Sequence, residues 1–307
     1  MTLESFDVTT VGHLCIDSII LPSRTKPFIV LGGATTYTSF VAKRLDASAA
    51  VISKVGEDFP EAYLWWLEQE GVDTCGVVRA NNEKSTRFQL EYNTDLSERT
   101  LTLKGKACPI NLEDLPKNFH SKAIHVAPIA GEITCDVVER LKGYADVLSL
   151  DPQGFLRSFD AEGNVSAASL MDKNILSLIK IYKSCQSEIT QLTGQSELKK
   201  AVKDVHDFGV ETVIVTMGAK GAHLSVEGAQ YDIPACQSEV LVDPTGAGDV
   251  FIGGFLAEYI QKKEPLWCAC VGSAAASLVV EGLGPTYFGN QQEIYWRANK
   301  IFKKKEE

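Results

Sequence analysis

Short apolar stretches alternate with amphipathic stretches along most of the chain. The apolar stretches are rich in β-branched residues and predict central strands at Asp7–Val11, Ala49–Ser53, Ala123–Val126, Val147–Leu150, Ile179–Tyr182 and Thr212–Thr216. The amphipathic stretches predict helices at Thr36–Leu45, Pro60–Glu70, Cys135–Lys142, Ser196–Asp207 and Val250–Gln261. This alternation predicts an α/β fold with a mainly parallel sheet and crossover helices. Because no repeat or long linker interrupts it, we expect a single domain over residues 1–307.

Two strand-like stretches, residues 14–22 and 85–105, stand where crossover helices are expected. In the second, Arg87–Tyr92 alternates with period two, a polar turn follows, and Thr100–Lys104 alternates again. The pattern predicts a small sheet that projects from the main layer as a lid. An edge hairpin of the main sheet is the alternative.

Composition narrows the class of protein. The chain has 307 residues, of which 45% are hydrophobic and 23% charged, so it can bury a large core and is not disordered. A formal net charge of −10 argues against binding to a nucleic acid backbone. No apolar run is long enough to span a bilayer, and the first residues lack the pattern of a secretory signal. We therefore expect a cytoplasmic protein with neither nucleic acid nor membrane as a partner.

The eight cysteines form no Cys-x-x-Cys pair, and Cys268-x-Cys270 lies in an apolar helical stretch. Without the ligand spacing of a zinc site, and in a large chain without an export signal, they predict free thiols.

The strongest chemical signal is Val242-Asp-Pro-Thr-Gly-Ala-Gly-Asp-Val-Phe-Ile-Gly-Gly-Phe. A strand end runs into a turn of small residues, and an apolar helix follows. Gly246, Ala247 and Gly248 allow backbone N–H groups to converge at the helix N-terminus, which favours negative charge. Asp249 stands at the same point and can accept a proton from a hydroxyl. The alternative is a glycine-rich turn in which Asp249 only caps the helix.

This string resembles the C-terminal signature of the PfkB (ribokinase-like) carbohydrate kinases, with Pro244 where the family usually has threonine. Leu31-Gly-Gly-Ala-Thr-Thr-Tyr, Val55-Gly-Glu-Asp-Phe and Ile214-Val-Thr-Met-Gly-Ala-Lys-Gly-Ala resemble further family motifs in the right order. The resemblance implies a ribokinase-like three-layer α/β/α fold and an ATP-dependent phosphotransferase. It makes Asp249 the general base and residues 246–248 the anion hole.

The resemblance also implies a binding site for the phosphoryl donor, ATP. Thr216, Gly218 and Gly221 would line the ATP site, with a tight turn after the strand as the alternative. Ser273 and Ser277 lie where the family closes over the adenine and often binds a monovalent cation such as K⁺, but close helix packing also selects small residues. Asp243 and Thr245 are candidates for the same cation site through their oxygen atoms.

A departure concerns the metal. The family usually has Asn-x-x-Glu before Leu-Thr-Gly, and here Glu188 is retained while Cys185 replaces the asparagine. A neutral thiol is a poor ligand for Mg²⁺, whereas a carboxylate is a good one. Glu188 is therefore the Mg²⁺ candidate, with a surface glutamate as the alternative.

On the acceptor side, Asp17 matches the family's substrate-binding aspartate, and a carboxylate accepts hydrogen bonds from adjacent hydroxyls. Gly32 and Gly33 would let a sugar ring approach the backbone. Tyr37 replaces the usual asparagine, and Arg157 is a candidate for contacting polyol or phosphate. His13 either contacts a hydroxyl or is structural.

Scattered similarities favour the myo-inositol kinase branch, with a small polyol or sugar as the bound partner. The alternative is a nucleoside or pentose kinase, in which Tyr37 or Phe88 stacks on a base. A non-catalytic sugar- or nucleotide-binding regulator is the alternative from another class. Exposed lid strands would allow a homodimer.

Overall fold

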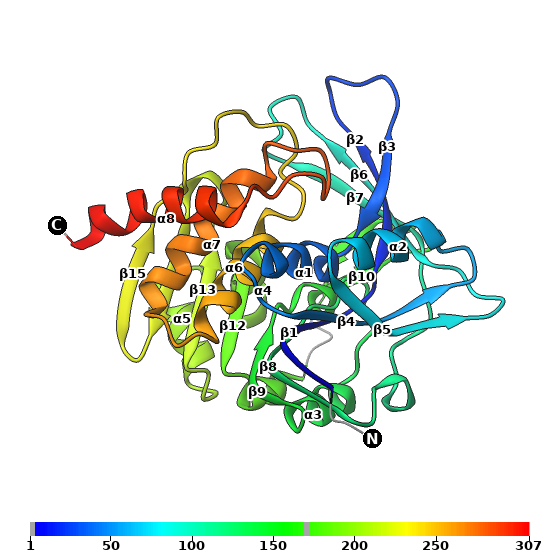
Figure 1. Cartoon of the computed structure of the whole chain (residues 1–307), viewed down its shortest axis with the longest axis horizontal. Helices are drawn as coiled ribbons and strands as arrows, with labels where there is room; N and C mark the ends of the chain where they lie inside the picture. The colour runs from blue at the N-terminus through cyan, green and yellow to red at the C-terminus, as the bar shows by residue number, and fades with distance from the viewer. Residues whose placement is uncertain (1–3, 169–171, 307) are drawn as a thin grey trace.

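The computed structural model describes residues 4–168 and 172–306, and its main feature is a nine-stranded sheet with helices on both faces (Figure 1). The strand order is β15-β14-β13-β12-β9-β8-β1-β4-β5. The seven strands from β13 to β5 pair in parallel, and β14 and β15 are antiparallel additions at one edge. Their bounds are β1 Glu4–Val11, β4 Ala49–Gly56, β5 Val72–Ala80, β8 Phe119–Val126, β9 Ala145–Leu150, β12 Ile181–Cys185, β13 Thr212–Thr216, β14 Ala222–Val226 and β15 Ala229–Ile233.

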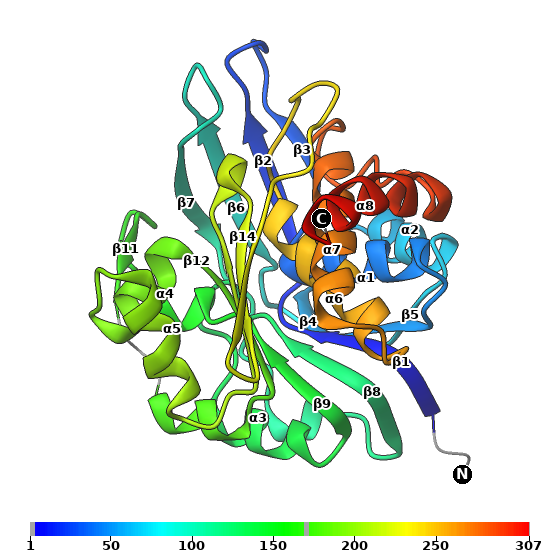
Figure 2. The same ribbon diagram turned by 90° about the vertical axis from the view of Figure 1, so that its left-hand side faces the viewer.

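Two layers of helices cover the sheet, as the view along its edge shows (Figure 2). One face carries α1 Ala34–Arg44, α2 Glu61–Gln69, α6 Ala247–Tyr259, α7 Pro265–Val279 and α8 Gln291–Glu306. The other carries α3 Cys135–Lys142, α4 Gln186–Thr193 and α5 Leu198–His206. Short 3₁₀ helices connect these elements: η1 Leu112–Asp114, η2 Gln153–Leu156, η3 Lys173–Leu178 and η4 Gly218–Lys220.

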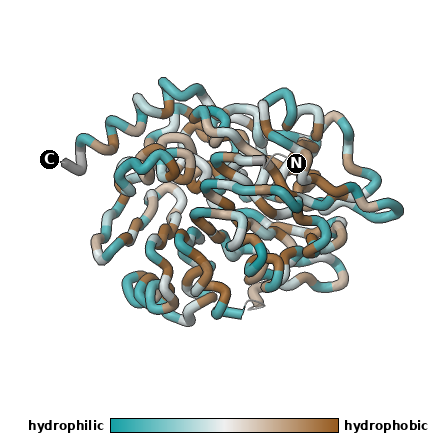
Figure 3. The backbone as a smooth tube through the Cα atoms, turned by 60° about the horizontal axis from the view of Figure 1, so that its bottom comes forward, coloured by the Kyte–Doolittle hydropathy of each residue, from teal (hydrophilic) through white to brown (hydrophobic). Residues whose placement is uncertain are grey.

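The central strands are apolar on both faces because each face is covered. In β13, Ile214 packs into the core beneath α1, α6 and α7, whereas Val213 and Val215 pack into the core beneath α3, α4 and α5. Successive side chains of a strand point to opposite faces, so a strand buried on both sides becomes a continuous apolar run. Hydrophobic segments accordingly run through the middle of the chain trace (Figure 3).

A separate four-stranded sheet projects beyond the carboxyl ends of the parallel strands (Figure 2). It consists of β2 Cys15–Ile20, β3 Phe28–Gly32, β6 Thr86–Tyr92 and β7 Arg99–Gly105, in the order β3-β2-β6-β7. The predicted lid is therefore confirmed, and the edge-hairpin interpretation is wrong. A small hairpin of β10 Arg157–Phe159 and β11 Val165–Ala167 adjoins it, since Leu103 N–H donates to the Gly163 carbonyl at 2.8 Å.

Close helix packing sets the position of α6. A Cβ atom added at Gly253 would lie 2.7 Å from the Thr38 carbonyl oxygen and 2.4 Å from Val41 Cγ1. The Thr38 hydroxyl also donates to the backbone carbonyl of Asp249 at 3.1 Å. Glycine at this helix contact thus lets α1 hold the first turn of α6, where the candidate base stands.

The predicted elements exist with shifted ends. The helix expected from Val250 begins at Ala247, so the predicted anion hole lies within its first turn. The stretch expected to be one helix at Ser196–Asp207 is preceded by a separate helix, α4, which begins directly after β12. Over the described ranges, no helix is both long and apolar enough to cross a bilayer.

Candidate active site

A pocket lies between the lid sheet and the carboxyl edge of the main sheet, the edge at which open α/β sheets bind ligands. Segments from across the chain contribute to it: β2, α1, the lid strands β6 and β7, the loops after β8 and β9, and the start of α6. Its lining residues are Cys15, Asp17, Gly33, Ala34, Tyr37, Phe88, Leu90, Arg99, Leu101, Ile129, Gln153, Arg157, Thr245, Gly246 and Asp249. The fold therefore brings together the residues predicted for the acceptor and the predicted base.

The first turn of α6 carries free backbone donors. Gly246 caps the helix in a left-handed conformation, with φ of 78°. Ala247 N–H is used locally, because it donates to the Pro244 carbonyl at 3.3 Å. Within the described part of the chain, the N–H groups of Gly248 and Asp249 have no such partner. These two amides and the helix dipole are therefore the candidate anion hole, to which the sequence pattern did not assign the Asp249 amide.

Tyr37 packs directly on this turn. A Cβ atom added at Gly246 would lie 2.3 Å from Tyr37 Cδ1, so only glycine fits both the backbone angle and the space. The Tyr37 ring also meets Phe288, with ring centroids 6.4 Å apart. Its hydroxyl is buried and has no partner among the described residues. Tyr37 therefore forms a wall of the pocket beside the candidate anion hole.

The electrostatics of Asp249 suit a general base. Burial raises the pKa of Asp249 to about 6, while the Lys183 ammonium acts in the opposite direction. Asp151 adds a further raising effect through its negative charge. A carboxyl group with a pKa near 6 is mostly ionised at neutral pH and holds a proton better than an ordinary aspartate does.

A buried ion pair stands behind this turn. Lys183 Nζ, from β12, lies 2.6 Å from Asp151 Oδ2, and both side chains are almost fully buried. Burial opposes the charge of Lys183, but the attraction of Asp151 keeps the pKa of the ammonium above its usual value. Neither residue of this pair was predicted from the sequence. An ionisable residue inside an otherwise apolar strand was the available signal.

Asp17 forms the polar end of the acceptor pocket. It is buried, and its Oδ1 accepts a hydrogen bond from Cys15 Sγ at 3.0 Å. A Cβ atom at Gly32 would lie 2.0 Å from Asp17 Oδ2, so only glycine at this position leaves room for the carboxylate. Burial raises the pKa of Asp17 to about 6, partly offset by the Cys15 hydrogen bond.

The remaining wall of the pocket is largely apolar. Phe88, Leu90 and Leu101 come from the lid, and Ile129 comes from the loop after β8. Arg157 also lines the pocket, and its guanidinium donates to the Ile129 carbonyl at 3.1 Å. The pocket thus joins a polar end to an apolar face.

A chain of hydrogen bonds ties the lid to the loop that precedes α6. Arg99, which the sequence analysis missed, donates to the Tyr92 hydroxyl at 3.0 Å. The Tyr92 and Thr245 hydroxyls lie 2.8 Å apart, and Thr245 Oγ1 donates to Asp243 Oδ1 at 2.6 Å. Since the Thr245 proton goes to the carboxylate, Tyr92 is the donor to Thr245. Gly284 N–H donates to the other oxygen, Asp243 Oδ2, at 2.8 Å.

The residues predicted as cation ligands differ in their surroundings. Glu188 caps α4, and its Oε2 accepts the Cys185 N–H at 2.7 Å. Both oxygens of Asp243 are occupied by the loop hydrogen bonds, so Asp243 and Thr245 brace the loop. The ranges that the structure describes contain no cluster of three or more histidine, cysteine, aspartate or glutamate side chains suited to a metal. A monovalent cation at Asp243 and Thr245 stays a prediction.

The predicted donor-side residues lie at and beyond the end of β13. Thr216 Oγ1 donates to the Ser184 carbonyl at 3.3 Å, and Gly218 and Gly221 form the turn that follows. The hydroxyl of Ser273 donates to the Pro234 carbonyl and accepts from the Cys236 N–H.

Two more predicted residues serve the protein's own packing. Ser277 donates to the Ala274 carbonyl and accepts from Arg297. His13 bonds through one ring nitrogen to Thr86 Oγ1 and through the other to the Cys108 carbonyl. His13 thus ties the base of the lid to β1, which is the structural interpretation of this residue.

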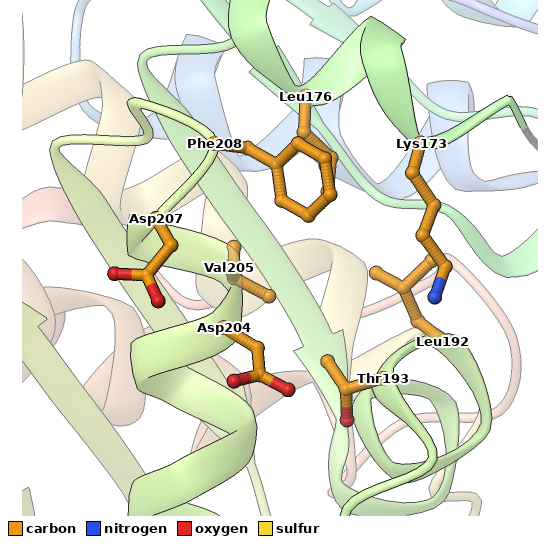
Figure 4. Close-up of a pocket in the computed structure, with 8 residues that line it drawn as sticks. All are labelled: Lys173, Leu176, Leu192, Thr193, Asp204, Val205, Asp207 and Phe208. Atoms are coloured by element: carbon orange, nitrogen blue, oxygen red, sulfur yellow. The ribbon is translucent and has the colours of Figure 1, made fainter.

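A second pocket lies between η3, α4 and α5, away from the lid (Figure 4). Leu176, Leu192 and Phe208 line it, with Lys173 and Asp204 among its polar residues. It contains none of the residues predicted to carry chemistry.

Comparison with known proteins identifies the family. Residues 6–292 match the model of the pfkB family carbohydrate kinases. The chain belongs to this family, and it is accordingly a phosphotransferase, a sugar or nucleoside kinase.

The relatives differ in their acceptors. A cytidine kinase of Thermococcus kodakarensis is 29% identical over 281 residues, which cover 91% of this chain and 97% of the relative. An inositol 3-kinase of Arabidopsis thaliana is 26% identical over 290 residues, covering 92% and 76%. A pyrophosphate-dependent kinase of the ribokinase family, solved with a pyrophosphate analogue and myo-inositol, superposes with a TM-score of 0.79 at 21% identity, covering 94% and 99%. This similarity confirms the ribokinase-like α/β fold with its lid sheet.

Proposed function

We propose that this chain, as one kinase domain over residues 1–307, transfers a phosphoryl group from ATP to a hydroxyl of a nucleoside. The observation that carries the proposal is the mixed character of the lid pocket. Asp17 stands at its polar end, Asp249 at the anion hole, and Phe88, Leu90 and Leu101 form an apolar face.

A nucleoside suits this combination of surfaces. Its ribose has two adjacent hydroxyls, and the Asp17 carboxylate can accept a hydrogen bond from each of them. Its base is a flat ring that packs on apolar side chains. The primary hydroxyl is then the one left for Asp249. By contrast, myo-inositol carries a hydroxyl on every ring carbon, and those that face Phe88 and Leu101 would lose their hydrogen bonds to water without replacement.

A cyclic polyol such as myo-inositol is the second candidate. Two guanidinium groups, those of Arg99 and Arg157, line the same pocket and can donate to hydroxyls. The similarity to inositol kinases supports the same candidate. Acceptor preference therefore depends on whether the apolar face or the two arginines dominate binding.

Transfer would proceed in line and without a phosphoenzyme. The acceptor hydroxyl loses its proton to Asp249 while its oxygen forms a bond to the terminal phosphorus of ATP. The bond from that phosphorus to the bridging oxygen breaks, and ADP leaves with the electron pair. The amides of Gly248 and Asp249 donate to the oxygens of the transferring group.

Mg²⁺ would arrive with the phosphates of the donor. Proteins usually hold Mg²⁺ through one or two carboxylates together with substrate phosphates and water, so a dedicated cage of side chains is not needed. Glu188 fits this role, because its charge acts on both Lys183 and Asp249. Bound Mg²⁺ supplies charge neutralisation on the phosphate oxygens.

The test is a matrix of acceptors and donors. We expect kcat/KM to be highest for one of cytidine, uridine, adenosine, guanosine or inosine with ATP, and lower for ribose, fructose and myo-inositol. A clear preference for myo-inositol would support the second candidate. Pyrophosphate in place of ATP tests the donor. Tight binding of nucleoside and nucleotide without turnover would indicate a non-catalytic regulator and contradict the proposal.

A further inference from the structure

Lys183 is a buried ammonium group with unused donors at the edge of the anion hole. Its side chain is 5% exposed, and its ion pair with Asp151 occupies one of its three N–H bonds. No further hydrogen-bond partner is found for Nζ within residues 4–168 and 172–306. Two donors of a charged group therefore remain available.

The position of Nζ is set against the first turn of α6. A Cβ atom added at Gly248 would lie 2.9 Å from Lys183 Nζ, which means that the ammonium occupies the side-chain space of residue 248. The free N–H of the same residue is one of the two anion-hole donors. The largest effect of a neighbouring charge on Asp249 also comes from Lys183. The distance at Gly248 and the charge effect on Asp249 thus both put Lys183 beside the base and the amides.

A purely structural role does not explain this arrangement. Burying an ion pair removes two charges from water, and a well-packed apolar pair of the same volume often serves stability equally well or better. A lysine with two unsatisfied donors adds to that cost. The arrangement is physically reasonable if a negatively charged group completes the hydrogen bonds of the ammonium during the reaction.

We propose that Lys183 is a further catalytic residue, which donates to the oxygens of the phosphoryl group as it passes from donor to acceptor. The proposal rests on phosphoryl transfer at this site and is independent of which acceptor is used. The bonds made and broken are those of in-line transfer: the acceptor oxygen bonds to phosphorus, its proton goes to Asp249, and the leaving oxygen departs with the donor. Lys183 keeps its protons throughout, held in place by Asp151.

A double-variant experiment separates this role from simple neutralisation of Asp151. Lys183→Met, Asp151→Asn and the combined variant are compared with Lys180→Met, a matched control that removes a lysine just before the same strand, paired with Glu211 on the surface. If Lys183 acts on the phosphoryl group, Lys183→Met lowers kcat by about 10²–10³-fold, the effect of removing one such donor. The combined variant recovers thermal stability but stays as slow. Recovery of kcat to within a few-fold of wild type would overturn the proposal.

A binding measurement gives a readout that does not depend on turnover. ADP affinity is measured with and without aluminium fluoride, which mimics the transferring group, in the presence of Mg²⁺ and the best acceptor. We expect aluminium fluoride to tighten ADP binding in wild type and in Lys180→Met. In Lys183→Met this tightening should be lost, while ADP alone binds normally. Equal tightening in Lys183→Met would refute the role of Lys183. Absence of tightening in wild type would instead contradict phosphoryl transfer at this site.

Discussion

Tyr92→Phe removes a hydroxyl through which the lid strand β6 bonds to the loop before α6. The hydroxyl donates to Thr245 and accepts from Arg99. Thr245 still donates to Asp243 in the variant, so no buried donor is left unpaired. Arg99 is solvent-exposed and can bond to water instead.

The expected magnitude follows from these contacts. A single neutral hydrogen bond contributes about 0.5–1.5 kcal/mol, and the Arg99 contact adds little because it is exposed. A loss of about 1 kcal/mol in lid closure corresponds to about a five-fold change in an equilibrium constant. We therefore expect about five-fold weaker acceptor binding and a similar fall in kcat/KM. Because the closed lid excludes water, ATP hydrolysis should rise relative to transfer.

The assay combines acceptor titration by calorimetry with steady-state kinetics and thermal unfolding. Tyr144→Phe is the matched control, since this ring packs on Phe119. The control should match wild type in acceptor binding, and Tyr92→Phe should keep its ADP affinity. Wild-type acceptor binding in Tyr92→Phe would refute the idea that the Tyr92–Thr245 bond holds the lid closed.

Four further predictions concern the pH dependence of rate, the pH dependence of stability, the metal and the backbone. Because Asp249 must be ionised to accept a proton and burial raises its pKa to about 6, kcat/KM should rise through pH 6 and level off above it, which a pH profile tests; a plateau already reached at pH 4.5 would contradict this. Because burial raises the pKa of Asp17 from 3.8 to about 6, stability should fall as pH rises from about 4 to about 6 and stay lower above that, so Asp17→Asn should raise Tm at pH 8 and change it little at about pH 3.5. Glu188→Gln should shift the dependence of rate on free Mg²⁺ to higher concentration with acceptor KM unchanged; an unmoved metal curve would make Glu188 only a helix cap. Gly246→Ala should lower Tm more than Gly218→Ala, because both have positive φ but only residue 246 meets a buried ring; equal Tm losses would contradict the contact with Tyr37.

Short sequence patterns predicted the strands whose burial shows directly in the order of apolar and polar residues. The apolar run Thr212–Thr216 is a strand with those bounds, because a strand buried on both faces must be apolar throughout. The period-two alternation of Arg87–Tyr92 predicted a lid strand for the opposite reason, since one of its faces is buried and the other is more accessible. The strand β3, Phe28–Gly32, was missed because its end lies in a glycine motif whose turn residues conceal the strand.

The candidate site was predicted where motifs are contiguous and missed where it depends on distant segments. Gly246 and Asp249 lie within one string, and the fold keeps them at one helix start. Lys183 and Asp151 are 32 positions apart, and Tyr92 and Thr245 are 153 apart, so only the folded chain reveals these pairs. The motifs did not predict which acceptor is bound, because this depends on the side chains that two sheets bring together around one pocket.

The most direct test of the account is phosphoryl transfer from radiolabelled ATP to nucleosides, measured for wild type and Asp249→Asn under the same conditions. We predict that wild type forms one phosphorylated acceptor for each ADP. Asp249→Asn should be slower by at least about 10²-fold, the lower range for loss of a general base, while it still binds ADP and nucleoside within a few-fold of wild type. Near-normal transfer by a folded Asp249→Asn protein would contradict the account.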